Sequence, residues 1–140
     1  MAYDRDNVFA RILRGEIPCD KVYEDEHTLV FMDIHPVTDG HTLVITKEHY
    51  ETIFEASEVA LTAVAATARR VSAAIREVLR PDGLMVFQLN GAAAGQTVFH
   101  YHMHLMPRAA GEPLALHART LGKPERLAEI ATLLAKHLAA

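Results

Sequence analysis

Three histidines alternate with large apolar residues in the stretch from His100 to Leu105, which reads His-Tyr-His-Met-His-Leu. Strict alternation with aromatic neighbours is typical of a β-strand. Successive side chains on a strand point to opposite faces. We therefore expect the three imidazoles on one face and the intervening side chains in a core on the other, with Pro107 ending the strand. The histidines are His100, His102 and His104.

Such a row of imidazoles suits two kinds of chemistry. Two histidines at i and i+2 can share a zinc ion, but the first and third lie about 13 Å apart on a straight strand and do not easily reach one ion. A neutral imidazole is also a good nucleophile and proton carrier near pH 7. The preceding turn, 95–97, adds backbone N–H groups that can receive an anion. The pattern favours catalysis over a metal site, and both over a purely structural role.

Composition limits the partners of the chain. Its 140 residues are half apolar and 23% charged, which is typical of one globular domain. The net charge of −4 argues against binding to duplex nucleic acid or to an anionic membrane surface. Cys19 is the single cysteine, so no internal disulfide is possible, and we expect a cytoplasmic protein. We see neither a signal peptide nor an apolar run of about 20 residues that would span a membrane.

The remaining pattern predicts the elements that position the histidines. A short helix over 7–15, the longest helix over 57–80 and a final helix from Pro124 have apolar residues at the helical period. Besides the histidine stretch, strands are expected at 21–24, 28–33, 42–46 and 84–90, with a flexible loop at 91–94 and irregular chain at 109–123. Short connections between paired strands favour antiparallel pairing. The predicted fold is α+β: a five-stranded antiparallel sheet with a short N-terminal helix, one long central helix and a C-terminal helix.

The histidine stretch and several other segments resemble the histidine triad family of nucleotide-binding hydrolases and transferases. The family signature alternates three histidines with apolar residues after a phosphate-contacting turn, to which Gly95–Val98 is similar. Gly15–Pro18 resembles the opening of the family, and Phe31–Ile34 with Gly40–His41 resembles its nucleoside-binding segment. The resemblance covers roughly the first 108 residues. It implies one histidine triad domain over 1–140, with a core of about 7–108 and a C-terminal extension, 109–140, that matches nothing in the family pattern.

The resemblance implies a role for each histidine. His102 would attack an α-phosphate and form a nucleotidyl-histidine intermediate, while His104 would hold a phosphate oxygen or a proton. His100 and His41 would orient His102 and fix its tautomer. These four histidines are the predicted catalytic residues.

The resemblance also implies a nucleotide-binding surface. Asp33 would accept hydrogen bonds from ribose hydroxyls, although an aspartate at a strand end can instead cap a turn. Apolar side chains would form a slot for the base, with packing in the core as the alternative, and Asn90 would contact substrate. The backbone of 95–98 would bind the phosphate. The predicted nucleotide-binding set is Phe9, Ile12, Phe31, Asp33, Ile34, Asn90, Gly95, Gln96, Thr97 and Val98.

The function that this resemblance implies is hydrolysis of purine nucleoside 5′-phosphoramidates or related nucleotide conjugates. The enzyme would be a homodimer whose two sheets join edge to edge, and it would need no cofactor. A dinucleoside polyphosphate hydrolase is an alternative, because Met106–Arg108 also resembles that branch. A galactose-1-phosphate-type transferase is less favoured, because that branch tends to carry glutamine where His104 stands. Outside enzymes, the alternative is a nucleotide-binding regulator with negligible turnover.

One departure from the family concerns zinc. Some bacterial members carry a Cys-x-x-Cys pair near the first helix as part of a structural zinc site. The corresponding segment here is Asn7–Ala10, which has no cysteine. We therefore expect no metal, and we expect His49, which could have served such a site, on the surface.

Overall fold

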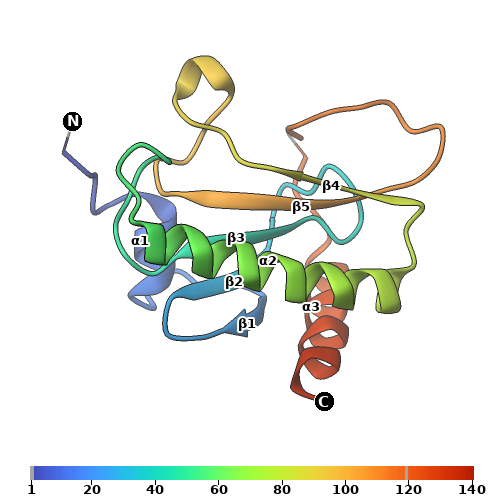
Figure 1. The fold of residues 1–140 in the computed structure, drawn as a ribbon. Coiled ribbons are helices and arrows are strands. Elements are labelled where there is room, and N and C mark those ends of the chain that lie inside the picture. The colour runs from blue at the N-terminus through green and yellow to red at the C-terminus, as the bar shows by residue number, and fades with distance from the viewer. Residues whose placement is uncertain (1, 119) are drawn as a thin grey trace.

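The structure is a computed structural model that describes residues 2–118 and 120–140. Five strands form one sheet in the order β1-β2-β3-β5-β4, and every neighbouring pair is antiparallel (Figure 1). With its helices, this sheet confirms the predicted α+β fold. The strands are β1 Lys21–Glu24, β2 Thr28–Met32, β3 Thr42–Thr46, β4 Gly83–Phe87 and β5 His102–Arg108. The helices are α1 Val8–Leu13, α2 Glu58–Leu79, the short 3-10 helix η1 Ala92–Ala94, and α3 Pro124–Ala139.

The histidine strand begins later than predicted. β5 starts at His102, so the expectation that His100 lies on the strand is wrong. The chain is outside the ladder just before β5, because the N–H of Tyr101 donates to the carbonyl of Tyr50 at 2.6 Å. The first histidine is therefore positioned by contacts other than sheet pairing.

Two further expectations fail around this strand. Pro107 does not end β5 but lies within it, opposite Leu84 of β4. Pairing with β3 stops at Leu105, so at Pro107 the strand has a neighbour on one side only, and a missing N–H is tolerated there. The expected flexible loop at 91–94 contains the helical turn η1, closed by a hydrogen bond from the N–H of Gly95 to the carbonyl of Ala92 at 3.0 Å.

Both faces of the sheet are covered, which is why β2 and β3 are buried along their whole length. α2 and α3 pack on one face, and α1 packs on the other. Leu43 and Ile45 face α1, and the register of β3 with β5 places them opposite His104 and His102. Because paired residues point to the same side of a sheet, these two imidazoles lie on the α1 face. The side chains between them join the α2 core, as predicted.

The chain between β5 and α3 is fixed at both ends. Near its start, the N–H of Ala110 donates to Oδ2 of Asp82 at 2.8 Å. At its end, the N–H of Gly122 donates to the carbonyl of Ile34 at 2.8 Å. We call the described residues of this segment, 109–118 and 120–122, the strap. Its two anchor points lie in different loops: Asp82 just before β4 and Ile34 just after β2.

Helix α3 closes the α2 side of the molecule. It begins at Pro124 and packs on α2 and β1 (Figure 1). Arg126 in its first turn pairs with Asp39 in the loop between β2 and β3, with Nε 3.0 Å from Oδ2. Within the described ranges, none of the helices combines the length and the hydropathy that crossing a membrane requires.

Candidate active site

Most of the predicted site residues line one cavity of about 710 Å³, bordered by α1, the β2–β3 loop, β5 and the strap. The strap contributes Leu116, His117 and Ala118 to its wall. Predicted residues in the lining are Phe9, Ile12, Phe31, Asp33, Ile34, His41, Thr97, Val98, His102 and His104. Predicted residues outside the lining are Asn90, Gly95, Gln96 and His100.

His102 presents one ring nitrogen to the cavity. Its Nδ1 lies 2.6 Å from the carbonyl oxygen of His100. A carbonyl only accepts, so Nδ1 carries the proton and Nε2 keeps a free lone pair. The ring of Phe9 meets the imidazole edge-on, with centroids 4.9 Å apart. The imidazole of His102 is thus held in one orientation, with the lone pair of Nε2 available to a ligand in the cavity.

His104 presents an N–H donor where His102 presents a lone pair. Nδ1 of His41 accepts a hydrogen bond from the N–H of Val37 at 3.1 Å, so the proton of His41 sits on Nε2. That N–H donates to Nδ1 of His104 at 2.9 Å, which leaves the proton of His104 on Nε2. The ring of Phe87 stacks on His104 with centroids 4.3 Å apart. A lone pair on His102 and an N–H on His104 therefore occur on rings whose centroids are 4.9 Å apart.

His100 lies outside the cavity lining and contacts His102 through its backbone. Its Nε2 donates to the carbonyl of Thr46 at 2.6 Å, so its Nδ1 accepts the hydrogen bond from the Tyr3 hydroxyl. Its own carbonyl accepts the hydrogen bond from Nδ1 of His102 and so fixes the tautomer of that ring. Tyr3 was not identified from sequence, because a contact across 97 positions leaves no local pattern.

The residues around Tyr3 do not fit a zinc site. The Tyr3 ring stacks on His49 with centroids 4.6 Å apart while its hydroxyl engages His100. One aromatic side chain thus contacts both His49 and His100. His49 is exposed, as expected.

Burial lowers the pKa of every histidine in this cluster. It is the main reason that the pKa of His100 falls to about 4 and that of His104 to about 2. The pKa values of His41 and His102 shift downward for the same principal reason, and the charge of Asp33 opposes the shift in both. The four imidazoles are therefore neutral at pH 7.

The apolar end of the cavity combines the two roles considered for its residues. Phe9 and Phe31 pack edge to face with centroids 5.4 Å apart and belong to the buried core of the α1 face. Both also line the cavity, together with Ile12 and the half-exposed Ile34. A flat aromatic ligand entering here would meet side chains that the fold already holds in place.

Asp33 likewise combines two roles. Its Oδ1 accepts the N–H of His35 at 2.8 Å, which caps the turn after β2. Its Oδ2 lies 3.5 Å from Nε2 of His41, and the residue lines the cavity. Asn90 has a different place: its Oδ1 accepts the N–H of Ile53 at 2.7 Å, outside the cavity lining.

The turn before the histidines offers fewer anion donors than expected. The N–H groups of Gly95 and Gln96 already donate to the carbonyls of Ala92 and Gly91. The Gln96 side chain is buried and bonds only to backbone groups. Within the described part of the chain, this leaves the N–H groups of 97 and 98 and the Thr97 hydroxyl for a phosphate.

One set of side chains could approach a metal ion. Asp33, His41 and His104 each place a ligand atom within 4.8 Å of the others. However, the His41–His104 hydrogen bond at 2.9 Å already uses the facing nitrogens. A metal bound there would have to displace that proton, so the arrangement favours proton and phosphate chemistry.

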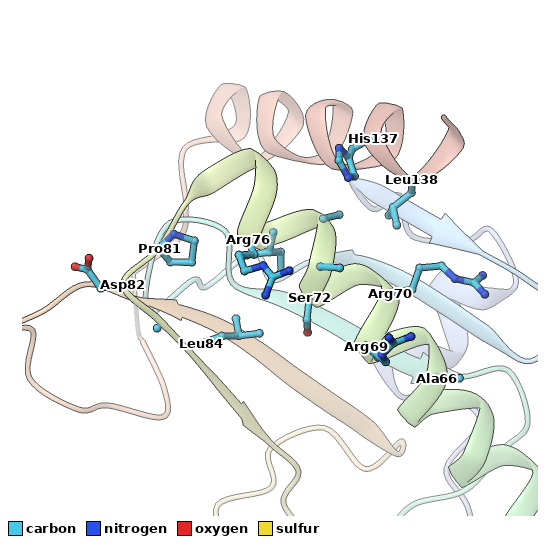
Figure 2. Close-up of a pocket in the computed structure, with 14 residues that line it drawn as sticks. Ala66, Arg69, Arg70, Ser72, Arg76, Pro81, Asp82, Leu84, His137 and Leu138 are labelled. Carbon is cyan, nitrogen blue, oxygen red and sulfur yellow. The ribbon is translucent and has the colours of Figure 1, made fainter.

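A second cavity, of about 920 Å³, lies between α2, α3 and the start of β4. Figure 2 shows Arg69, Arg70 and Arg76 of α2 beside it, with Leu84 of β4 and His137 of α3. None of the predicted site residues lines it. The smaller cavity, with its convergent imidazoles, is therefore the candidate active site.

Comparison with other proteins places this geometry in a family. A HIT domain model matches residues 14–111. The Protein hit of Bacillus subtilis (strain 168) is 44% identical over 137 residues, which cover 94% of this chain and 94% of that protein. The Adenylylsulfatase HINT3 of Arabidopsis thaliana is 37% identical over 139 residues, which cover 95% of this chain and 70% of that protein.

Solved structures agree with the sequence match. A Hit-like protein involved in cell-cycle regulation from Bartonella henselae superposes with a TM-score of 0.91 and 38% identity, over 97% of this chain and 98% of that one. A histidine triad nucleotide-binding protein from Sulfolobus tokodaii gives a TM-score of 0.85 and 32% identity, over 94% of this chain and 91% of that one. The domain match spans more than half of the sequence, and the chain belongs to the HIT, or histidine triad, family of nucleotide-binding proteins.

Proposed function

We propose that this protein hydrolyses the bond between the α-phosphate and the leaving group of purine nucleoside 5′-phosphoramidates or related nucleotide conjugates. The observation that carries the proposal is the pair of fixed tautomers: a lone pair on His102 Nε2 beside an N–H on His104 Nε2. Phosphoryl transfer asks for positioning and charge stabilisation. The pair supplies a nucleophile and a donor to a phosphate oxygen at the same place.

The reaction would proceed in two displacements. Nε2 of His102 attacks the α-phosphorus, the bond to the departing group breaks, and that group leaves with the electron pair. The product on the protein is a nucleotidyl-histidine, with the ring proton still on Nδ1 and held by the carbonyl of His100. Water then attacks the same phosphorus, the bond to His102 breaks, and a nucleoside monophosphate is released.

The rest of the cavity suits the nucleotide. A purine fits the apolar end, where Phe9 and Phe31 are already packed. Asp33 would accept the ribose hydroxyls through the oxygen that faces His41. The N–H groups of Thr97 and Val98 would receive the phosphate oxygens. The base, the ribose and the phosphate would thus each contact side chains or N–H groups of matching polarity.

Several classes of leaving group suit this reaction. The name of the Arabidopsis relative points to adenylyl sulfate for that protein, and the resemblance of Met106–Arg108 to the dinucleoside polyphosphate branch adds those compounds as candidates. A panel of nucleoside phosphoramidates, adenylyl sulfate and dinucleoside polyphosphates, ranked by kcat/KM, would identify the preferred class. Tight binding of AMP or GMP with no cleavage of any conjugate would instead support the regulator.

The decisive experiment substitutes His102. In His102→Ala we expect kcat to fall by several orders of magnitude with little change in nucleotide Kd, because the lost bond exists only in the transition state and intermediate. Asp33→Ala should show the opposite pattern, weakening binding by about 1–3 kcal/mol. Rapid acid-free quenching with labelled substrate should trap the nucleotide on His102. An adduct on His100 or His104, or normal turnover by His102→Ala, would refute the assignment.

The proposal includes a homodimer in the cytoplasm. Support for the dimer comes from β4, which is the outer strand of the sheet and has Val86 about half exposed. An outer strand has unpaired backbone groups that a second copy can satisfy. Support for the location is the single cysteine.

A further inference from the structure

We propose that His117 of the strap donates the proton that the leaving group takes up when its bond to the α-phosphate breaks. This inference rests on the proposed function and adds a histidine of the strap to the four predicted catalytic histidines. The sequence pattern did not identify this residue, since it lies in the extension that resembles nothing in the family. Its place in the structure is the reason for the assignment.

The layout of the cavity defines where a leaving group must go. The apolar end takes the base, and His102 and His104 take the phosphate. The lining also includes His35, Thr97, Val98 and the strap residues Leu116–Ala118. A group attached to the α-phosphate and directed away from the nucleoside therefore extends toward the strap.

His117 lies against the phosphate-binding turn itself. Its Nε2 is 3.4 Å from the position that a Cβ on Gly95 would occupy. Gly95 has φ +100 and carries no side chain there, so the imidazole nitrogen approaches the backbone of the turn closely. The ring nitrogen is thus beside the turn in which the N–H groups of Thr97 and Val98 remain for phosphate oxygens.

The chain on either side of His117 is anchored to the rest of the fold. Beyond the anchors at Asp82 and Ile34, the guanidinium of Arg108 donates to the carbonyls of Glu112 and Pro113 at 3.0 and 2.7 Å. Arg126, just after the strap, pairs with Asp39. These contacts fix the segment on either side of His117, as a catalytic group requires.

The chemistry of the site calls for a separate proton donor. His41, His102 and His104 are neutral, and the single proton of His102 is held by a backbone carbonyl. His117 is exposed to solvent and can regain a proton from water after each turnover. Burial is the first cause of the lowered pKa of His104, and the charge of His117 is among the further causes.

The proposed step balances as follows. Protonated His117 gives its proton to the nitrogen or oxygen of the departing group while the bond from that atom to phosphorus breaks. The group leaves as a neutral amine or alcohol, and His117 becomes neutral. Water restores the proton on His117 before the next substrate binds.

The test compares two adenosine 5′-phosphate conjugates that differ in their need for a proton. An alkylamine phosphoramidate requires protonation to leave, whereas a 4-nitrophenyl ester leaves as a stable phenolate. We expect His117→Ala to lower kcat/KM for the phosphoramidate by about 100-fold or more, and at least ten times more than for the ester. His117→Gln should show the same difference, since an amide donates hydrogen bonds but not protons. Leu114→Ala on the strap and His137→Ala on α3 are the matched controls.

Each outcome is decisive. Equal losses on both substrates would show that His117 only shapes the strap, and unchanged rates would show that it is a bystander; either result overturns the inference and leaves the proposed function intact. A wild-type protein that cleaves neither conjugate defeats the proposed function and this inference together. A selective loss on the phosphoramidate establishes the proton donor.

Discussion

At the scale of single residues, hydrogen bonds set the tautomer of each imidazole in the site. The Tyr3 hydroxyl donates to His100, and His100 donates to the carbonyl of Thr46. The carbonyl of His100 then fixes His102, just as Val37 fixes His41. Each proton position follows from a backbone carbonyl or N–H group, either directly or through a neighbouring imidazole. His102, the proposed nucleophile, is consequently oriented by a backbone carbonyl rather than by a carboxylate.

The buried histidines make stability depend on pH. The pKa of His100 is about 4 in the folded protein and about 6.5 in an unfolded chain. Between these values the unfolded state binds the proton and the folded state does not, so the free energy of unfolding decreases as pH falls. We expect urea midpoints to drop from pH 7 to pH 5, and His100→Gln to show a shallower drop because it lacks this group.

The difference in pH dependence between the wild type and His100→Gln reports on His100 alone, since the carboxylates contribute equally to the stability of both proteins. His137→Gln, at an exposed position on α3, serves as the control and should follow the wild type. Identical slopes for His100→Gln and the wild type would contradict the assignment.

At the scale of elements, the turn between β2 and β3 carries His41 into the site. Gly40 has φ +90, and a Cβ there would come within 2.4 Å of Leu79 Cδ1 and 3.1 Å of Pro107 Cγ. The turn is therefore pressed between the end of α2 and the end of β5. The contact of three elements at one glycine sets how far His41 reaches toward His104.

We expect Gly40→Ala to destabilise the protein and to lower kcat. The matched control is Gly111→Ala, where φ is +86 but a Cβ would meet nothing within 4 Å. Both variants carry the strain of positive φ, so the added loss in Gly40→Ala, about 1–3 kcal/mol, measures the overpacking. Thermal or urea unfolding of the two variants gives the comparison. Equal stabilities would show that Leu79 moves aside without cost.

Elements were easier to predict than the contacts between them. Alternation placed His102, His104 and the side chains between them on their faces, because a strand's period is local. The start of β5 depended instead on one hydrogen bond from Tyr101 to Tyr50. Phe87 was missed because strand pairing, not sequence spacing, stacks it on His104. His117 was missed for the same reason, since the fold brings it to the site.

At the scale of the whole molecule, the two outer strands of the sheet are not equivalent. β1 is packed by α3. β4 has no strand beyond it within the described residues, and Val86 on it is 49% exposed. A second copy can therefore add its own β4 and continue the sheet. The arginine-lined cavity in Figure 2 lies beside the same strand.

We expect light scattering to give twice the monomer mass of 15.5 kDa for the wild type at micromolar concentration. Val86→Arg should reduce the mass to that of the monomer, because a charge would be buried at the junction of the two sheets. Ile53→Arg, at another exposed apolar position, should leave the mass unchanged. A monomeric wild type, or a Val86→Arg protein that remains dimeric, would exclude pairing through β4.

The position of the strap along the chain has an evolutionary consequence. The HIT domain match ends at 111, whereas the strap continues to 122 and then returns to the fold through α3. The wall proposed to face the leaving group is therefore encoded apart from the nucleophile, whose strand is constrained by pairing on both sides. Substitutions can accumulate in one segment without disturbing the other. Family members that share the histidine motif can thus diverge in the conjugates they cleave, and exchanging this segment between them is a direct route to new specificities.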